Sequence, residues 1–391
     1  MKKILHIVPT PFFASRGCHM RILGEIRALQ RRGYESVVVT YHNGEEVENL
    51  AIKRTIRIPW YNKLEAGPSL HKYYLDVLLF FKTLMVVRKE KPDLIHGHLH
   101  EGVFIGHLVR KVLFSKIPLV FDVQGSLTKE LDTFNYFQKF NFMRRFFSWA
   151  EHYICSMADF FICSSNSNAE LVKGMGFDES KVEPVIDGVH TDFFNVEVDD
   201  KFKENLGIPA DKKVVIYTGA LLKAKGLNYL LEVIPLVLNK MPEVYFLIIG
   251  YPVEESKKAI EEKGLLDRVK FVGMVDYFEL PKYLHISDVA LDPKEDKAGE
   301  SSGKIINYMG AGLPVVCFDS LNNRNFLSDS GIYAQNASAE DLAAKIELVL
   351  ENESLAKEKG KGAKARVEKV YSWDASIEKI ITAYNSLLPE I

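Results

Sequence analysis

The chain has 391 residues, of which 47% are apolar and 26% are charged, a composition typical of a soluble globular protein with enough length for two domains. The formal net charge of −2 disfavours a dedicated nucleic-acid-binding protein, because such a protein would carry a strong basic excess. The charge is uneven: residues 1–190 contain 25 Lys and Arg against 20 Asp and Glu, which favours an anionic partner such as a phosphorylated lipid or a membrane surface.

Short apolar runs alternate with amphipathic helical stretches from the first residues onward, which is typical of a parallel α/β architecture. The apolar run in MKKILHIVPTPFF is too short for a signal peptide and predicts a first strand. The strands expected in the first half are Ile4–Val8, Ser36–Thr40, Leu94–His96, Leu119–Val123, Phe160–Cys163 and Pro184–Ile186. The strands expected in the second half are Val214–Thr218, Val244–Gly250, Val269–Val272, Val289–Leu291 and Pro314–Phe318. Helices fill the gaps, for example Met20–Arg31 and Leu227–Leu238.

The strand–helix rhythm restarts near residue 212, after a polar passage (Asn195–Lys213) that is typical of an interdomain linker. We therefore expect two doubly wound parallel-sheet domains, 1–190 and 191–372, that bind ligands in a cleft beyond the carboxyl ends of their strands. Residues 373–391 are expected to form a further helix that returns to the N-terminal domain.

The cysteines and the apolar stretches predict a cytoplasmic protein. The longest apolar stretch, YYLDVLLFFKTLMVV, is interrupted by Asp76 and Lys82, so no membrane span is expected. The cysteines lack CxxC or metal-ligand spacing and are expected to be small core residues of a protein in a reducing compartment: Cys18, Cys155, Cys163 and Cys317. The sequence also leaves open a peripheral contact of this cytoplasmic protein with the inner face of the plasma membrane.

Two glycine-containing loops follow predicted strands and are candidates for phosphate binding. Ala14–Gly17 would let the backbone approach an anion at the start of the next helix. Thr218–Gly226 places Lys223 and Lys225 beside another helix start, where ammonium groups suit a phosphate. A structural turn is the alternative for the first loop, and a solvated lysine pair is the alternative for the second.

A third candidate lies in the stretch GESSGKIINYMGAGLPVV, residues 299–316. Ser301 or Ser302 can cap a helix that begins near Gly303 and leaves several backbone N–H groups unpaired. Those amides and Lys304 would together bind an anion. An ordinary capped helix is the alternative interpretation.

Two further side chains of this stretch suit a sugar nucleotide. Asn307 would hydrogen-bond a ribose hydroxyl, and Glu300 would accept hydrogen bonds from sugar hydroxyls. A nicotinamide dinucleotide is disfavoured because no GxGxxG follows the first strand.

Five stretches in chain order resemble the retaining glycosyltransferases of family 4, which have the GT-B fold of two Rossmann-like domains facing across a cleft. These stretches are RGCHMRILGEIRALQRRGYESVVVT, KPDLIHGH, KVEPVIDGVHTDFF, YTGALLKAKGLNYLLEVI and NYMGAGLPVV. The resemblance extends over nearly the whole chain, and five matches in the family's order are specific. It implies an acceptor-side N-terminal domain and a C-terminal domain that binds the nucleotide sugar.

The resemblance also implies roles for single residues. Gly17 would supply a backbone N–H near the departing phosphate, and Lys225 would contact the diphosphate. The diphosphate-binding set is then Gly17, Lys223, Lys225, Ser301, Ser302, Gly303 and Lys304. We expect Lys225, Glu300 and Gln124 to serve catalysis, and Arg16, His98 and Ser126 to lie on the acceptor side.

Several positions depart from the family's pattern. Ala220 stands where many members have an arginine, and Lys223 is expected to compensate for it. Asn307 takes the place of the second glutamate of the E-x7-E element, the ribose ligand, and Glu300 is one residue closer to it than usual. Gln124 replaces the usual histidine after the fifth strand, so this side chain can hydrogen-bond a hydroxyl but cannot carry a positive charge.

No Asp-x-Asp occurs in the chain, so the usual carboxylate pair for a bridging metal is missing, and we expect neither a metal nor another cofactor. Lysines and helix-end amides must then neutralise the leaving group electrostatically. Members of the family use front-face attack, in which the departing phosphate oxygen helps to deprotonate the acceptor.

Alternating histidines and an aromatic-basic run remain. His96, His98 and His100 would share one face of a strand end, and we interpret them as a polar cleft rim instead of a metal site, because no matching carboxylate is evident.

The run at 134–153, FNYFQKFNFMRRFFSWAEHY, carries aromatic residues on almost every side of a helix. A buried helix is the favoured interpretation, and a membrane-surface or lipid-acceptor contact is the alternative.

The sequence therefore predicts a retaining, metal-independent glycosyltransferase that moves a sugar from a nucleoside-diphosphate sugar to a hydroxyl acceptor. A glycan or lipid-linked acceptor in cell-envelope or exopolysaccharide synthesis is expected by analogy. A sugar-nucleotide epimerase on the same fold and a non-catalytic nucleotide-sugar-binding protein are the alternatives.

Overall fold

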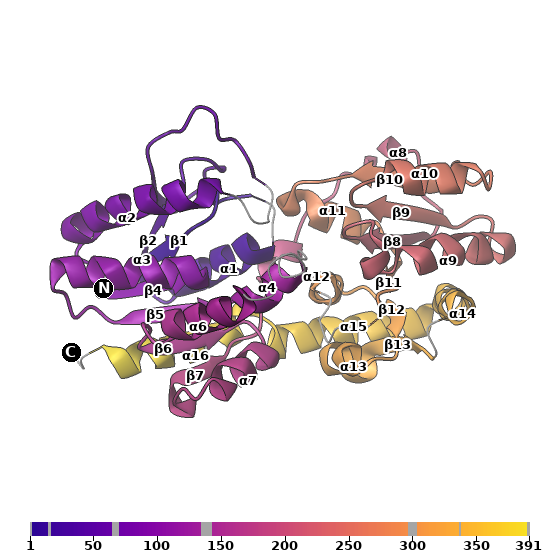
Figure 1. Cartoon of the computed structure of the whole chain (residues 1–391). Coiled ribbons are helices and arrows are strands. Elements are labelled where there is room, and N and C mark those ends of the chain that lie inside the picture. The colour runs from indigo at the N-terminus through magenta and orange to yellow at the C-terminus, as the bar shows by residue number, and fades with distance from the viewer. Residues whose placement is uncertain are drawn as a thin grey trace. The chain divides into compact units, whose positions relative to one another are not determined.

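Figure 1 shows the computed structural model, which describes residues 2–14, 17–64, 70–133, 143–295, 303–335 and 338–388. The chain divides into two compact units. Unit 1 comprises Met1–Gly188 and Ser376–Ile391, and unit 2 comprises Val189–Ala375. The boundaries expected at 190 and 372 lie two and three residues from these limits.

Unit 1 is built on a seven-stranded, wholly parallel sheet with the order β3-β2-β1-β4-β5-β6-β7. Its strands are β1 (Lys3–Val8), β2 (Glu35–Thr40), β3 (Ala51–Arg54), β4 (Leu94–His98), β5 (Leu119–Val123), β6 (Phe160–Cys163) and β7 (Val182–Pro184). Its helices are α1 (Gly17–Arg31), α2 (His71–Glu90), α3 (Leu99–Leu113), α4 (Leu127–Thr133), α6 (Met143–Cys155) and α7 (Asn166–Gly174), with a 3-10 turn η1 (Glu179–Lys181).

The two faces of this sheet are covered by different helices. The apolar sides of α2, α3, α6 and α7 form one core with the central strands. A second, smaller core lies beneath α1, where Ile22, Leu23 and Ile26 pack against Val8 and Val38. The sheet is therefore buried on both faces, as parallel sheets require.

The last helix, α16 (Trp373–Leu387), belongs largely to unit 1, where it lies in yellow beside the indigo and magenta elements (Figure 1). Its residues Ile377, Ile380 and Tyr384 are fully buried. Glu378 pairs with Arg32 of unit 1 at 2.9 Å. The chain thus crosses to unit 2 near residue 189 and returns near residue 375.

Unit 2 is built on a six-stranded parallel sheet with the order β10-β9-β8-β11-β12-β13. Its strands are β8 (Val214–Thr218), β9 (Tyr245–Ile249), β10 (Val269–Gly273), β11 (Val289–Asp292), β12 (Val315–Phe318) and β13 (Gly331–Ala334). Its helices are α8 (Phe202–Asn205), α9 (Leu227–Lys240), α10 (Glu254–Glu261), α11 (Leu280–His285), α12 (Lys304–Gly310), α13 (Leu321–Leu327), α14 (Ala339–Glu351) and α15 (Glu353–Val370). The 3-10 turns are η2 (Thr191–Phe194), η3 (Lys223–Lys225), η4 (Tyr277–Glu279) and η5 (Ser328–Ser330).

The observed strands agree with the predicted ones in the middle of both sheets and differ at the edges. The edge strands β3 and β13 were not predicted, and β7 lies two residues before the expected Pro184–Ile186. All four cysteines are free thiols, and three of them are buried. Among the described residues, none of the helices is both long and apolar enough to cross a bilayer.

Candidate functional site

The loop between β8 and α9 in unit 2 is shaped by two glycines with positive φ. Gly219 has φ +128° directly after the strand, and Gly226 has φ +86° directly before the helix. A Cβ on Gly226 would lie 2.1 Å from the Pro293 carbonyl oxygen, so only glycine fits this approach of two backbones. The Tyr217 hydroxyl donates a hydrogen bond to the Ala220 carbonyl oxygen at 3.0 Å. The loop therefore has a defined conformation.

Lys223 and Lys225 lie on η3, within this loop. Lys223 is exposed and Lys225 is half-buried. Because β8 is a central strand of a parallel sheet, its carboxyl end is where such sheets bind ligands. Lys223 and Lys225 follow that end of β8, at the place where the sequence predicts phosphate-binding lysines.

Lys304, the first residue of α12, lies beside the same loop. Its Nζ is 3.8 Å from where a Cβ on Gly219 would stand and 4.0 Å from the ring centroid of Tyr217. The same Nζ forms an ion pair with the fully buried Asp292 carboxylate at 2.9 Å. The structure thus brings two of the predicted loops together, but it gives Lys304 a buried carboxylate partner that the sequence did not suggest.

Asn307 and Tyr308 follow on the same helix and connect it to two other elements. The Tyr277 hydroxyl lies 3.3 Å from Asn307 Oδ1, and Tyr277 stacks on Phe193 with 4.7 Å between ring centroids. The backbone N–H of Thr218, the last residue of β8, donates to the Tyr308 hydroxyl at 2.8 Å. Asn307, the predicted ribose ligand, is half-buried. Its side chain is oriented by the hydrogen bond from Tyr277 of η4.

Some predicted site residues lie at the limits of the described chain. Gly303 is exposed and directly precedes α12. Glu300, Ser301, Ser302 and Arg16 fall outside the described residues.

In unit 1, Gly17 is the first residue of α1, and a Cβ on it would meet no atom within 4 Å. The loop before it is tied to the helix by the buried His19, whose Nδ1 lies 2.9 Å from the backbone of Ala14 and whose Nε2 lies 2.9 Å from Thr10 Oγ1. The expected approach of the Gly17 backbone N–H to an anion stays a prediction.

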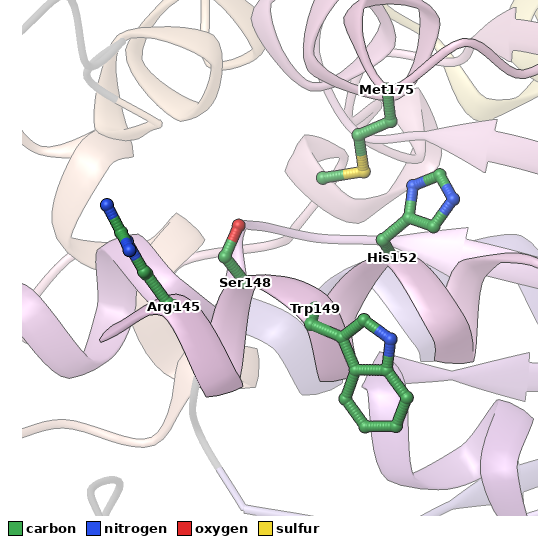
Figure 2. Close-up of a pocket in the computed structure, with 5 residues that line it drawn as sticks. All are labelled: Arg145, Ser148, Trp149, His152 and Met175. Carbon is green, nitrogen blue, oxygen red and sulfur yellow. The ribbon is translucent and has the colours of Figure 1, made fainter. Parts of the chain in front are cut away.

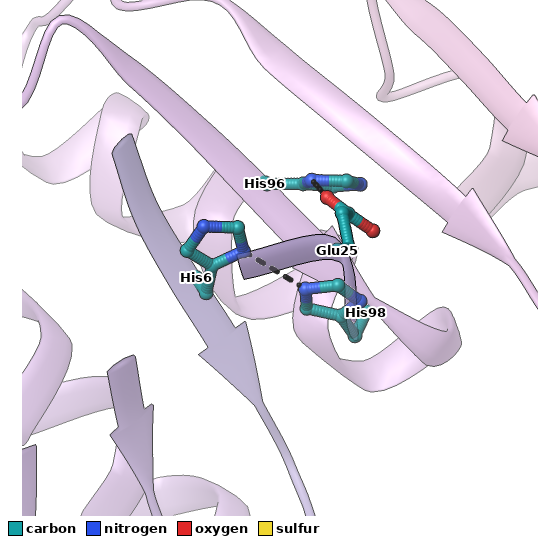
Figure 3. A group of neighbouring side chains, drawn as sticks. All are labelled: His6, Glu25, His96 and His98. Carbon is teal, nitrogen blue, oxygen red and sulfur yellow. Dashed lines mark hydrogen bonds and ion pairs between the residues drawn. The ribbon is translucent and has the colours of Figure 1, made fainter. Parts of the chain in front are cut away.

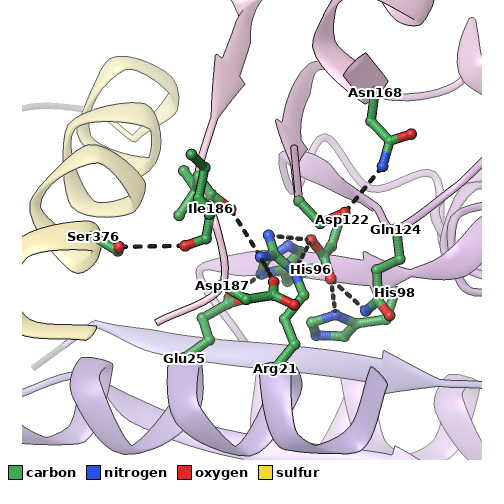
Figure 4. A network of polar contacts seen from close by, with 12 residues as sticks. Arg21, Glu25, His96, His98, Asp122, Gln124, Asn168, Ile186, Asp187 and Ser376 are labelled. Carbon is green, nitrogen blue, oxygen red and sulfur yellow. Dashed lines mark hydrogen bonds and ion pairs between the residues drawn. The ribbon is translucent and has the colours of Figure 1, made fainter. Parts of the chain in front are cut away.

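A buried polar network centres on Asp122 in β5 (Figure 4). Arg21 Nε of α1 donates to Asp122 Oδ1 at 2.9 Å, and Gln124 Nε2 donates to Oδ2 at 2.7 Å. His98 Nδ1 lies 2.9 Å from the same Oδ2. Burial alone would raise the pKa of Asp122, but the Arg21 charge and the His98 hydrogen bond outweigh it and hold that pKa well below its usual range. Because ionised Asp122 only accepts, His98 carries its proton on Nδ1.

The prediction of a histidine rim is wrong. His96 and His98 are 0% exposed and belong to β4, whereas His100 is 8% exposed and lies on α3. The two ring nitrogens of His98 face Asp122 and His6, at 2.9 and 3.1 Å. His98 is therefore buried within unit 1, whereas the sequence analysis expected it to contact the acceptor.

Ser126 is also engaged within the fold. Its hydroxyl accepts a hydrogen bond from the Lys129 backbone N–H at 3.2 Å at the start of α4. Glu151 accepts from the backbone N–H of Leu127 and of Thr128, at 2.9 and 3.2 Å. Burial would raise the pKa of Glu151, but hydrogen bonds from His100 and Thr128 lower it to about 2.

Sequence reasoning missed the charged residues that organise both units. Arg21 and Glu25 lie one helical turn apart on α1, so both point to the sheet, and this i, i+4 spacing was the available signal. Asp122 lies within the buried strand β5, and Asp292 is the last residue of the buried strand β11. A carboxylate is unexpected at such a position unless it is paired. Tyr384 gave no local signal because its partners are distant in the sequence.

The aromatic helix also differs from its favoured interpretation. The segment 134–142 lies outside the described residues, and α6 covers the remainder. Within α6 only Glu151 and Cys155 are buried, whereas Phe146, Trp149 and Tyr153 are 55%, 59% and 48% exposed. The expectation of a buried helix is therefore wrong for this segment.

A shallow hollow of about 440 Å³ adjoins α6 (Figure 2). It is lined by Arg145, Ser148, Trp149 and His152 of α6 and by Met175 just after α7. The hollow therefore combines a basic group with apolar and aromatic surface.

Two family models match the chain in succession. The model described as "Glycosyl transferase 4-like domain" matches residues 16–188, and that described as "Glycosyl transferases group 1" matches residues 198–366. The chain is a group 1, family 4-like glycosyltransferase.

This glycosyltransferase is similar to proteins of several organisms. It is 23% identical to Sulfoquinovosyl transferase SQD2 of Arabidopsis thaliana, over 96% of this chain and 72% of the relative. It is 22% identical to the capsular polysaccharide biosynthesis glycosyltransferase CapM of Staphylococcus aureus, over 81% of this chain and 83% of the relative. The crystal structure of Anabaena HepE in complex with UDP-glucose matches with a TM-score of 0.71 at 16% identity, over 99% of this chain and 100% of that one. The glycosyltransferase has the GT-B fold.

Proposed function

We propose that this glycosyltransferase transfers a sugar from a nucleoside-diphosphate sugar to a hydroxyl of a glycan or lipid-linked acceptor, in cell-envelope or exopolysaccharide synthesis. The observation that carries the proposal is the arrangement in unit 2. The loop with Lys223 and Lys225 lies beside Lys304 at the carboxyl end of β8, and Asn307 follows on α12. Three ammonium groups at one edge suit a diphosphate, whose oxygens carry its negative charge.

Lys225 and Lys223 are proposed to neutralise the diphosphate as its bond to the sugar breaks. Lys304 is proposed to act differently, because its charge is already shared with Asp292 at 2.9 Å. It would hold the Gly219 turn against α12 and contribute a partial charge to the nearer phosphate. Asn307, oriented by Tyr277, would bind the ribose.

The reaction is proposed to retain the anomeric configuration and to need no metal in the transfer step. The bond from the sugar C1 to the diphosphate oxygen breaks, and the bond from C1 to the acceptor oxygen forms on the same face. The acceptor proton passes to the departing phosphate oxygen, so the products are a nucleoside diphosphate and the glycosylated acceptor. Gln124, held by Asp122 at 2.7 Å, would hydrogen-bond a hydroxyl of the donor sugar or acceptor.

A donor-binding experiment tests this proposal. We expect Lys225→Ala to weaken the binding of UDP-glucose or another accepted donor by at least about tenfold, because a charge-assisted hydrogen bond is lost. Lys257→Ala, which removes an exposed lysine of α10 in the same unit, is the matched control and should bind donor like the parent chain. Affinity is measured by calorimetry after a thermal-shift panel of nucleoside-diphosphate sugars has identified the donor.

Transfer itself is followed by NMR of the product's anomeric centre, with and without added Mg²⁺ or Mn²⁺. Retention and an unchanged rate support the proposal. Inversion would contradict retention, a rate that depends on added metal would contradict metal independence, and epimerisation of the donor without acceptor would contradict transfer.

We further propose that unit 1 contacts an anionic membrane through the outer side of the helices α2, α3 and α6. Helix α3 packs against both α2 and α6, so the three helices form one layer over the sheet. Helix α2 exposes Tyr73, Val77, Phe81 and Met85 at every fourth position, which is one stripe of the helix. On α6 the exposed aromatic residues accompany Arg144 and Arg145. Apolar and aromatic side chains beside arginines are typical of contact with the headgroup region of a bilayer.

Co-sedimentation with vesicles tests the membrane contact. The parent chain is expected to bind vesicles rich in phosphatidylglycerol more strongly than neutral phosphatidylcholine vesicles. Replacing both Phe146 and Trp149 by Ser should reduce binding at least about tenfold, because two aromatic side chains lose their apolar burial. Trp60→Ser removes an exposed tryptophan elsewhere in unit 1 and should change nothing. If the parent chain stays in the supernatant with anionic vesicles, the membrane contact is wrong.

A further inference from the structure

Three imidazoles and one carboxylate converge in the interior of unit 1 (Figure 3). His6 on β1 and His96 on β4 are register partners on neighbouring strands, and His98 lies two residues further along β4. Their side chains therefore leave the same face of the sheet, and α1 brings Glu25 to that face. One ligand atom from each of the four side chains lies within 4.8 Å of the other three, and all four are 0% exposed.

Hydrogen bonding within the protein does not satisfy this cluster. His6 Nδ1 lies 3.1 Å from His98 Nε2, and His96 Nδ1 lies 2.8 Å from Glu25 Oε1. These contacts leave His6 Nε2, His96 Nε2 and Glu25 Oε2 buried and without a hydrogen-bond partner in the described part of the chain. A buried polar atom without a partner destabilises the folded state, because it has lost its hydrogen bonds to water. A cation that coordinates these three atoms would give each of them a partner.

The partners of the nearby charged groups leave the Glu25 carboxylate facing the histidines. Arg21 is bonded to Asp122 and to Asp187, whereas Glu25 is bonded to an imidazole and to the Tyr384 phenol.

The surroundings of His98 have the arrangement of a metal-binding histidine. Its Nδ1–H donates to Asp122 at 2.9 Å, and Arg21 in turn holds Asp122. This leaves Nε2 directed toward the centre of the cluster, where it faces His6 (Figure 3). Metal-ligating histidines almost always donate their other ring N–H to a carboxylate or carbonyl in this way, because the bond fixes the tautomer and the ring orientation.

We propose that His6, Glu25, His96 and His98 bind one Zn²⁺ ion. Imidazole nitrogens and a carboxylate oxygen are ligands of zinc, and bonds of about 2.0–2.2 Å place tetrahedral ligand atoms roughly 3.3–3.5 Å apart. The contacts of 3.1 and 2.8 Å within the cluster are shorter than this spacing, and one ligand atom from each of the four side chains lies within 4.8 Å of the others, so the side chains have to shift to bind the ion. Four protein ligands leave no open position, so the ion would be structural and would join β1, β4 and α1.

Metal content of the full chain tests the proposal. The protein is prepared without a histidine tag, refolded with or without Zn²⁺, dialysed against buffer freed of metals, and analysed by mass spectrometry of its metals. We expect one zinc per chain after refolding with Zn²⁺, and a higher thermal midpoint than for the metal-free protein, because a ligand that binds only the native state stabilises it. Substitution by Co²⁺ should give the visible absorption bands of a tetrahedral site.

Two variants and one control separate the cluster from adventitious binding. His96→Gln and Glu25→Gln keep the approximate size of the side chain and should each lose the zinc and the cobalt bands. His152→Gln removes an exposed histidine of α6 and should keep both. Circular dichroism shows whether each variant is folded, and if one of them is not, the other variant and the parent chain still give the result.

Three results would overturn the proposal. They are a folded parent chain without zinc after refolding with the ion, zinc retained equally by a folded cluster variant, and a thermal midpoint that does not respond to Zn²⁺. The cluster shares no ligand with the donor-binding loop of unit 2, so loss of the zinc proposal would leave the proposed transfer reaction as it stands.

Discussion

The Lys304 ammonium group and the Asp292 carboxylate form an ion pair beside Gly219, where Asp292 is fully buried and Lys304 nearly so. Breaking such a pair by removing one partner is costly because the other charge stays buried. Because Lys304 has this structural role beside its proposed role in binding, a loss of activity in its variants does not identify a direct contact with substrate. Lys223 and Lys225 on the loop itself are better probes of donor binding.

Asp76 of α2 gives a prediction that can be tested at the level of one titrating group. Its Oδ1 accepts a hydrogen bond from Tyr41 at 2.5 Å, and burial raises its pKa to about 7 although that bond and Lys72 oppose the rise. The native chain therefore holds a proton that the unfolded chain releases near pH 4. The proton bound by Asp76 therefore stabilises the native state. This stabilisation is fully present below about pH 4 and is lost as the pH rises toward 7.

We expect Asp76→Asn to flatten this pH dependence, and at pH 8 to raise the free energy of unfolding by about 1–2 kcal/mol, because the buried charge is removed from a partly solvated site. Urea unfolding at pH 5 and pH 8 measures the difference. Asp211→Asn, at an exposed position of unit 2, is the control and should shift neither curve. Parallel pH profiles for the parent chain and Asp76→Asn would contradict the assignment.

At the scale of elements, the loop between β8 and α9, which we propose binds the donor, depends on the close approach of two strand ends. Gly250 follows β9, and a Cβ on it would lie 1.9 Å from the Gly219 carbonyl oxygen. The Gly219 backbone N–H also donates to the Ile249 carbonyl at 2.9 Å. The position of the loop that carries Lys223 and Lys225 is therefore set by its neighbour strand as well as by its own glycines.

Gly250→Ala is expected to displace this loop and to weaken donor binding by at least about tenfold, with a loss of about 1–3 kcal/mol in stability from overpacking. Calorimetry with the donor and urea unfolding measure the two effects. Gly174→Ala is the control, because a Cβ there meets no atom within 4 Å and the residue ends a helix with ordinary φ. Unchanged donor affinity in Gly250→Ala would show that the loop does not bind the donor.

At the scale of the whole molecule, the chain folds unit 1 from both of its ends. Tyr384 of α16 places its hydroxyl 2.7 Å from His96 Nδ1, across 288 positions of sequence. Lys379 pairs with Glu183 at 2.8 Å, next to the end of the first segment of unit 1. The last helix therefore completes the core of the first domain.

Ile380→Ala tests this dependence, because the side chain is fully buried and its truncation leaves a cavity. We expect a loss of about 2–5 kcal/mol in the stability of unit 1. Hydrogen exchange followed by mass spectrometry should show faster exchange in β1 and β4 and unchanged exchange in β8 and β9. Thr382→Ala, at an exposed position of the same helix, is the control. Equal loss of protection in both units would contradict the assignment of α16 to unit 1.

The sequence by itself determined the two parallel α/β domains, the central strands and the loop with Lys223 and Lys225, because burial on both faces leaves continuous apolar runs and glycines mark the turns between them. It did not reveal β3 and β13, because these edge strands are only four residues long and their sequences, AIKR and GIYA, carry too little apolar pattern.

Only the tertiary structure decided the partners of the polar residues. The histidines of β4 looked like a solvated rim, because the sequence does not show that Glu25, His6 and Tyr384 come from three other elements to the same face. The tertiary structure likewise showed that the aromatic residues of α6 are exposed. The sequence could not show this, because the side of a helix that faces solvent depends on its neighbours in the fold. Local propensity and periodicity act within a segment, whereas ion pairs and burial depend on contacts between segments that are far apart in the chain.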